Sequence, residues 1–306
     1  MYKKTKIVYM GTPHYAKEIL ATLINAEDIE VTLVLTQPDR PVGRKKVLTP
    51  PPVKALAVEY GIEVLQPNRL REEGIEEAIR AAKPDYIIVA AFGQILPRSI
   101  LDIASCINLH ASLLPQYRGA SPVQQSLLHG DTVTGVTSML MEEGLDTGDM
   151  LLKSEFVIPN DMRLHALMSQ LTEEACILTL ETIRRFEQIT PQSQDESQAT
   201  LCKKIKKSDG EIAFDAAALI YDKYRAFEGW PGIFASNGTK FEGISLIENE
   251  SQNSAAIILG FEDESVIVGC SKGSLRIEQL QPASKKPMSA KAYCAGRGLK
   301  VGDSIV

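Results

Sequence analysis

The sequence lacks the cysteine spacing of a metal centre or a redox pair. Its five cysteines are scattered and include no C-x-x-C pair: Cys106, Cys176, Cys202, Cys270 and Cys294. An odd, scattered set is typical of reduced thiols in the cytoplasm and not of a disulfide framework. We therefore expect neither a catalytic cysteine nor a metal site.

Long apolar runs are also absent. No stretch approaches the roughly 20 apolar residues that a membrane span needs, and the basic N-terminus leads into a short strand pattern instead of a signal-peptide core. The net charge of −6 argues against a protein that coats nucleic acid non-specifically. We expect a cytoplasmic protein without a membrane partner.

A glycine-rich dinucleotide fingerprint is missing as well. Gly11-Thr12-Pro13 follows the first expected strand, where a dinucleotide-binding fold carries G-x-G-x-x-G. One glycine followed by a proline does not supply the close backbone approach that a pyrophosphate needs. Nicotinamide chemistry is therefore not expected.

Strands and helices alternate in the first part of the chain. This alternation predicts an α/β fold with a doubly wound, mostly parallel, Rossmann-like sheet. Ligands of such sheets bind beyond the carboxyl ends of the strands. The expected strands cover residues 6–10, 31–35, 63–65, 85–91, 103–109, 135–141 and 150–157, and the expected helices cover 13–24, 53–60, 69–82 and 162–188.

The second part of the chain has a different pattern. A polar, proline-containing segment at 190–207 predicts a linker. A chain of 306 residues is long for one core, so we expect a domain at 1–189 and a second one at 208–306. The second domain is expected to be a small β-barrel, with a helix at 216–227 and strands at 234–236, 256–259, 265–268 and 274–280.

An amide, an imidazole and a carboxylate mark the candidate site. Side chains two apart on a strand point the same way, so Asn108 and His110 should project together from a strand end. Asp146 stands between glycines and is expected on a loop. An imidazole can take the proton that an attacking amine sheds, and an amide can donate to an oxyanion. The trio suits acyl transfer to an amine, although an isolated histidine is more often structural.

The run N-x-H-x-S-L-L-P-x-x-R-G at 108–119, with G-L-D-T-G at 144–148, resembles the signature of the folate-dependent formyltransferases. Members of that family formylate methionyl-tRNA, glycinamide ribonucleotide or an aminoarabinose nucleotide. The run T-Q-P-D-R-P-V-G-R at 36–44 is similar to the tRNA-contacting loop of the members that act on methionyl-tRNA. Further matches are G-T-P at 11–13, A-F-G-Q-I-L-P at 91–97, W-P-G at 230–232 and Q-P-A-S-K-K at 281–286.

This resemblance implies an enzyme of translation initiation. It would transfer the formyl group of 10-formyltetrahydrofolate to the α-amine of methionyl-initiator tRNA. Asn108 would hold the oxyanion, His110 would act as acid and base, and Asp146 would support His110 and a proton-relay water. The resemblance also implies an OB-like second domain that binds tRNA, with no metal and no obligatory protein partner.

The same resemblance assigns the folate site. It places the donor against Ser112, Leu113, Leu114 and Pro115, with Gln94, Ile95 and Leu96 lining the pterin pocket. A flat heterocycle needs apolar walls and polar groups at its rim, so these residue types fit. The alternative is that Leu113 and Leu114 pack under the loop, which we expect of at least one of them.

Two basic segments are candidates for contact with tRNA. The loop at 36–52 carries Arg40, Arg44, Lys45 and Lys46, and the end of the linker carries Lys203, Lys204, Lys206 and Lys207. A planar guanidinium can donate two bonds to a phosphate or a guanine edge. Both segments have a plainer alternative as solvated surface, and the loop lacks a glycine that the family pattern carries after Arg44.

Two rival functions remain open at this stage. The first is a formyltransferase for a small amine such as a sugar nucleotide, against which the loop at 36–44 argues. The second is a folate- or tRNA-binding protein without turnover. That alternative does not explain why Asn108, His110 and Asp146 occur together.

Overall fold

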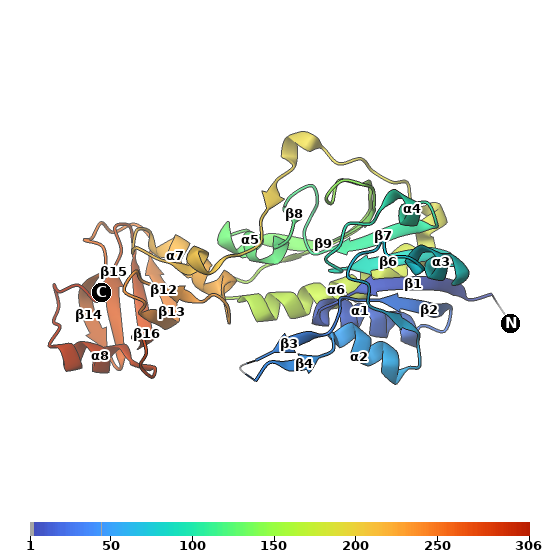
Figure 1. Cartoon of the computed structure of the whole chain (residues 1–306). Helices are drawn as coiled ribbons and strands as arrows, with labels where there is room; N and C mark the ends of the chain where they lie inside the picture. The colour runs from blue at the N-terminus through green and yellow to red at the C-terminus, as the bar shows by residue number, and fades with distance from the viewer. Residues whose placement is uncertain (1–2, 44) are drawn as a thin grey trace. The chain divides into compact units, whose positions relative to one another are not determined.

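The computed structural model describes residues 3–43 and 45–306. Arg44, one of the predicted tRNA contacts, lies outside the described residues. The chain divides into two compact units (Figure 1). The first unit comprises Met1–Pro122, Val133–Val157 and Leu167–Cys202, and the second comprises Val123–Thr132, Ile158–Ala166 and Lys203–Val306. Residues 190–202, expected to lie in a linker, therefore belong to the first unit.

A seven-stranded sheet forms the centre of the first unit (Figure 1). Its strand order is β10-β9-β7-β6-β1-β2-β5, and the ladders that join β7, β6, β1, β2 and β5 are parallel. β9 runs antiparallel to both of its neighbours. The strands are β1 (Thr5–Gly11), β2 (Ile29–Leu35), β5 (Val64–Leu65), β6 (Tyr86–Ala90), β7 (Ser105–His110), β9 (Val133–Leu140) and β10 (Met150–Val157).

Both faces of this sheet are covered. Val8 and Met10 of β1 belong to a buried cluster that includes Ile79 of α3 (Ile75–Ala81) and Ile100 of α4 (Arg98–Leu101). Tyr9, between them, points to the other face, where its hydroxyl donates to a carbonyl of α1 (His14–Asn25). The remaining helices of the N-terminal part are α2 (Pro52–Glu59), α5 (Pro122–Leu128) and α6 (Leu164–Arg185).

Short elements complete the first unit. β3 (Arg40–Val42) and β4 (Val47–Thr49) form an antiparallel hairpin within the segment 36–52, which the sequence pattern predicted to be a loop. β8 (Arg118–Gly119) pairs in parallel with β11 (Leu201–Cys202), which joins two segments more than 80 residues apart. Single 3-10 turns cover Phe186–Gln188 and Glu196–Gln198, and a third, Lys207–Gly210, lies in the second unit.

The second unit contains an antiparallel sheet in the order β12-β13-β16-β15-β14, with β17 paired to β16. The rings of Phe214 and Phe241 meet edge to face in its core, with centroids 5.4 Å apart. This confirms a small domain of antiparallel strands after an α/β domain. The elements are α7 (Ala217–Ala226), β12 (Ile233–Phe234), β13 (Lys240–Glu248), β14 (Ile257–Glu262), β15 (Ser265–Gly269), β16 (Ser274–Gln281), β17 (Met288–Ser289) and α8 (Ala290–Arg297).

No helix within residues 3–43 and 45–306 has the length and apolar content that crossing a membrane requires.

Candidate active site

The candidate site begins at the carboxyl end of β7. This strand is buried from Cys106 onward and pairs with β6 on one side and β9 on the other, so its backbone is fixed on both sides. Asn108 and His110 are two residues apart on it, and their exposed fractions are 8% and 6%. The strand therefore presents an amide and an imidazole from one face, as its alternation predicted.

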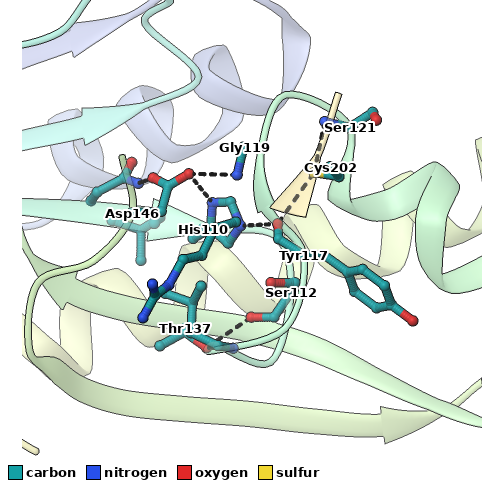
Figure 2. A network of polar contacts seen from close by, with 12 residues as sticks. His110, Ser112, Tyr117, Gly119, Ser121, Thr137, Asp146 and Cys202 are labelled. Carbon is teal, nitrogen blue, oxygen red and sulfur yellow. Dashed lines mark hydrogen bonds and ion pairs between the residues drawn. The ribbon is translucent and has the colours of Figure 1, made fainter. Parts of the chain in front are cut away.

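Asp146 reaches the same place from the loop between β9 and β10. Its Oδ2 accepts a hydrogen bond from the backbone N–H of Gly119 at 2.8 Å and lies 3.7 Å from Nδ1 of His110 (Figure 2). Its Oδ1 accepts from Nδ2 of Asn108 at 3.4 Å. The three predicted catalytic residues thus converge, with the carboxylate between the amide and the imidazole.

A backbone carbonyl determines which ring nitrogen of His110 carries the hydrogen. Nε2 of His110 lies 2.9 Å from the carbonyl oxygen of Tyr117 (Figure 2). A carbonyl only accepts hydrogen bonds, so Nε2 carries the hydrogen. In the neutral ring Nδ1 is then the unprotonated nitrogen, and Nδ1 is the atom that faces Asp146. Neutral His110 can therefore take up a proton at Nδ1.

The loop that follows β7 is tied to β9 and β10. The hydroxyl of Thr137 donates to the carbonyl of Ser112 at 2.7 Å and accepts from the N–H of Leu114 at 3.1 Å (Figure 2). Nζ of Lys153 donates to the carbonyl of Leu114 at 2.6 Å, and partial burial lowers the pKa of this lysine. Leu114 itself packs in a buried cluster with two methionines, as expected of one of the two leucines.

A cavity of about 410 Å³ lies beside the predicted pterin-binding residues. Gln94, Ile95 and Leu96 all line it, and Glu143 from the loop that carries Asp146 joins them. Gln94 is held by two hydrogen bonds: its Oε1 accepts from the N–H of Leu70, and its Nε2 donates to the carbonyl of Pro67. Leu96 is buried, whereas Ile95 is 71% exposed. The cavity thus has an apolar wall, and Arg69, Arg71 and Glu143 add charged groups to its lining.

The predicted RNA-contacting residues that the structure describes are exposed. Arg40, Lys45 and Lys46 lie on or beside the β3–β4 hairpin of the first unit. The lysines of the predicted linker lie in the second unit and are exposed as well: Lys203, Lys204, Lys206 and Lys207. Each group forms a basic patch on its own unit.

Two buried residues beside the site were missed from the sequence. Arg118 is 4% exposed and its guanidinium makes two hydrogen bonds to Glu196, at 3.0 and 2.7 Å, which lowers the pKa of that carboxyl. Gln194 accepts from Nε of Arg118 at 3.0 Å and donates to the loop that carries Asp146. Arg118 falls within the recognised run at 108–119, but Gln194 lies in a polar segment that gave no signal.

Asn108, His110 and Asp146 can stabilise a tetrahedral oxyanion and move a proton without a covalent bond between enzyme and substrate. Asn108 has two N–H donors, and its contact with Asp146 uses one of them. Outside residues 1, 2 and 44, which are not described, no group of three or more histidine, cysteine or carboxylate side chains is arranged to hold a metal ion.

Comparisons with known proteins identify the family. A model described as formyl transferase matches residues 4–183, and one for its C-terminal domain matches residues 204–298. The chain belongs to the formyl transferase family. The family predicted from the sequence is therefore confirmed.

Relatives of this formyl transferase extend over its full length. It is 74% identical over 303 residues to a methionyl-tRNA formyltransferase of Sulfurovum sp., covering 99% of this chain and all of the relative. It is 53% identical to a methionyl-tRNA formyltransferase of Sulfurimonas denitrificans, covering 98% and 99%. Its fold is similar to the N-formyltransferase of Helicobacter canadensis solved with folinic acid and dTDP-3-aminofucose. That structure gives a TM-score of 0.68 at 19% identity and covers 89% and 98%.

Proposed function

We propose that this formyl transferase carries the formyl group of 10-formyltetrahydrofolate to the α-amine of methionyl-initiator tRNA. The observation that carries the proposal is the convergence of Asn108, His110 and Asp146 in a chain that matches methionyl-tRNA formyltransferases from end to end. The products are formylmethionyl-tRNA and tetrahydrofolate. A substrate of translation initiation places the reaction in the cytoplasm.

The proposed chemistry assigns one task to each side chain. The amine attacks the formyl carbon, and the N–H of Asn108 stabilises the oxygen as it becomes negative. Nδ1 of His110 takes the proton that the amine loses, since Nε2 already holds a hydrogen against Tyr117. The tetrahedral intermediate then collapses with cleavage of the bond between the formyl carbon and N10 of the donor, and His110 returns the proton to N10, which leaves as tetrahydrofolate. Asp146 lies beside both groups and stabilises the imidazolium that results.

Two sets of residues are proposed to hold the formyl donor. Gln94, Ile95 and Leu96 line a cavity with an apolar wall, which suits a pterin ring. Ser112, Leu113, Leu114 and Pro115 form the loop directly after His110, so a donor against this loop would bring its formyl group to the catalytic residues. Hydrogen bonds to Thr137 and Lys153 keep the loop in place for that purpose.

The tRNA is proposed to contact two basic patches. The hairpin patch contains Arg40, Lys45 and Lys46, and the second patch contains Lys203, Lys204, Lys206 and Lys207. Arg44, which lies outside the described residues, is proposed as a further contact from its place in the sequence. The whole protein carries a net charge of −6, which would repel RNA. Binding of tRNA therefore requires local clusters of lysine and arginine that neutralise its phosphates. We assign the second unit to tRNA binding on this ground.

A transfer assay with two charged tRNAs tests the proposal. The enzyme is given 10-formyltetrahydrofolate and either methionyl-initiator or methionyl-elongator tRNA, and the formylated product is measured. We expect rapid turnover with the initiator and much slower turnover with the elongator. Asn108→Ala serves as the control for catalysis by the site.

Other outcomes identify the rival functions. Formylation of an amino sugar nucleotide, with neither tRNA used, would make the enzyme a small-amine formyltransferase and leave the hairpin patch without its proposed role. Tight folate binding with no transfer to any amine would contradict an enzymatic function altogether.

A further inference from the structure

The side chain of Gln194 lies buried against the loop that carries Asp146. Its Nε2 donates to the carbonyl oxygens of both Asp146 and Gly148, each at 2.8 Å. Its Oε1 accepts from Nε of Arg118 at 3.0 Å, and the residue is 9% exposed. All three hydrogen bonds join residues 46 to 76 positions apart in the sequence.

The two hydrogen bonds donated by Gln194 hold the backbone at Asp146, which has an unfavourable conformation. Asp146 has a φ of 54°, in the left-handed region that residues other than glycine rarely adopt. Its side-chain contacts with Asn108 and His110 are long, at 3.4 and 3.7 Å, so they cannot by themselves orient the carboxylate. The direction of the carboxylate therefore depends on the N–H of Gly119, which donates to Oδ2 at 2.8 Å, and on the backbone that Gln194 holds.

Arg118 connects Gln194 to the segment 117–119, which contacts His110 and Asp146. The carbonyl of Tyr117 accepts from His110, and the N–H of Gly119 donates to Asp146, so the two neighbours of Arg118 contact two catalytic residues. The guanidinium of Arg118 is itself fixed by Glu196 and by Gln194. Gln194 thus bridges the strand β8 and the loop at 141–149, which together enclose the carboxylate.

We propose that Gln194 is a positioning residue that aligns Asp146 with His110 and Asn108 for formyl transfer. The inference rests on the proposed function, because it assigns Gln194 an effect only through Asp146. It also gives a role in the reaction to the segment 190–202, which the sequence pattern indicated as a linker.

Two substitutions at Gln194 test this role. Gln194→Met keeps the length of the side chain and removes all three hydrogen bonds. Gln194→Glu keeps an acceptor for Arg118, loses the donor and places a carboxylate against the two carbonyl oxygens. Gln198→Met is the matched control, since Gln198 lies on the same segment, is exposed, and bonds only locally to Asp195. The values of kcat and of KM for each substrate are measured in the steady state, together with the melting temperature.

We expect both Gln194 variants to lose about 10- to 100-fold in kcat, the scale of a small misplacement of a catalytic group. KM for both substrates should stay within about twofold, and Gln198→Met should behave as the wild type. A Gln194→Met or Gln194→Glu enzyme that is folded and retains the wild-type kcat would overturn the inference. Two variants are used so that the test survives if one of them does not fold.

A double-variant cycle separates positioning from general stabilisation. In an Asp146→Ala background, removal of the Gln194 donor should cause no further loss of kcat, because the carboxylate that it aligns is gone. A full additional loss in that background would show that Gln194 acts elsewhere and would refute the inference. If Asp146→Ala itself keeps the wild-type kcat, the catalytic assignment of the proposed function and the inference both fail. A low kcat in Asp146→Ala with a normal kcat in Gln194→Glu rejects the inference alone.

Discussion

Asn108 offers the most direct test of catalysis at the scale of a single residue. Asn108→Ala removes the proposed oxyanion donor, and losing one such donor typically costs about 10²–10³ in turnover. Asn108→Asp should be at least as impaired, because a second carboxylate would stand beside Asp146, where the amide now donates at 3.4 Å. Steady-state kcat values at saturating substrates give the comparison. A kcat near the wild-type value in both variants would remove Asn108 from the mechanism.

The buried cysteines carry a second prediction, which concerns reactivity. Burial raises the pKa of the thiols of Cys106 and Cys270 to about 12 each. Only the thiolate is nucleophilic, so at pH 8 both residues should resist iodoacetamide in the native protein and react readily in urea. Mass spectrometry of the alkylated peptides measures this. Fast native alkylation at pH 8 would contradict their burial.

The same thiols affect stability in alkaline solution. A thiol whose pKa is raised in the folded state stabilises the protein below its unfolded pKa, and this contribution is lost as the pH rises from about 9 towards 12. The free energy of unfolding should therefore fall over this range. A Cys106→Ser, Cys270→Ser double variant, which has neither thiol, should lose less over the same range.

The catalytic residues were predictable from the sequence because local rules place them. Strand alternation puts Asn108 and His110 on one face, and two flanking glycines keep Asp146 out of a regular helix. Gln194 and Arg118 could not be found this way. Their hydrogen bond joins residues 76 positions apart, and a buried glutamine in a polar run has the same local sequence as an exposed one.

Among the elements, the β3–β4 hairpin carries the proposed contact with the tRNA acceptor end. Its base is anchored by Asp39, which accepts two hydrogen bonds from Nζ of Lys54 and one from Nε2 of Gln66. The side chain of Gln66 also donates to the backbone at Gln37, just before the hairpin. This anchor lies outside the hairpin itself, so it can be weakened without changing a basic side chain.

Asp39→Asn is therefore expected to raise KM for methionyl-initiator tRNA several-fold while KM for the folate donor stays within about twofold. The bond to Lys54 lowers the pKa of Asp39, so the anchor is present above the unfolded pKa near 4 and is lost as the pH falls below it. Steady-state kinetics with each substrate varied provide the measurement. An equal effect on both KM values would show that the anchor is not specific to tRNA.

Arg44→Ala tests the proposed tRNA contact of the basic sequence run at 40–46. We expect a large loss of kcat/KM for methionyl-initiator tRNA and little change for the donor, because a guanidinium can make two bonds to a phosphate or a guanine edge. Lys83→Ala, an exposed lysine far from the hairpin in sequence, is the control for loss of one charge. Unchanged tRNA kinetics would exclude Arg44 from recognition.

The elements that the sequence predicted are those with a strong apolar period. Strands β1, β2, β6 and β10 and helix α1 lie within about two residues of their expected bounds. The predicted helix at 69–82 begins only at Ile75, because Gly74 adopts a left-handed conformation with a φ of 84°. The longest strand of the second unit, β13, was missed, since Gly243 and its charged residues interrupt the alternation. Strands β3 and β4 are exposed, so they lack the alternation of buried and exposed residues that predicts a strand. They form through hydrogen bonds to each other.

At the scale of the whole molecule, the second unit contains more than the C-terminal part of the sequence. Two segments from the middle of the chain belong to it, Val123–Thr132 and Ile158–Ala166. Arg163 from one of them pairs with Glu228 at 3.0 Å and stacks over the ring of Tyr224 at 4.3 Å. The polar segment predicted one boundary, at residue 208. A single boundary cannot assign the two middle segments to the second unit, because contacts in the folded structure bring them there.

The charge distribution of the whole chain predicts how tRNA use depends on salt. A protein with a net charge of −6 has no general attraction for RNA, so binding must rest on phosphates neutralised by local patches. KM for methionyl-initiator tRNA should therefore rise steeply with salt, while KM for the folate donor, which carries far fewer negative charges than tRNA, should rise less steeply.

A fourfold lysine variant identifies which patch produces the salt dependence. Replacing Lys203, Lys204, Lys206 and Lys207 by glutamine should lower the slope of log KM against log salt by about three, because each phosphate contact contributes roughly 0.7–0.9. The matched control replaces four exposed lysines elsewhere, Lys3, Lys4, Lys83 and Lys300. Both variants change the net charge equally, so equal slopes would show that total charge controls binding. A reduced slope in the first variant alone assigns those phosphates to the patch at 203–207.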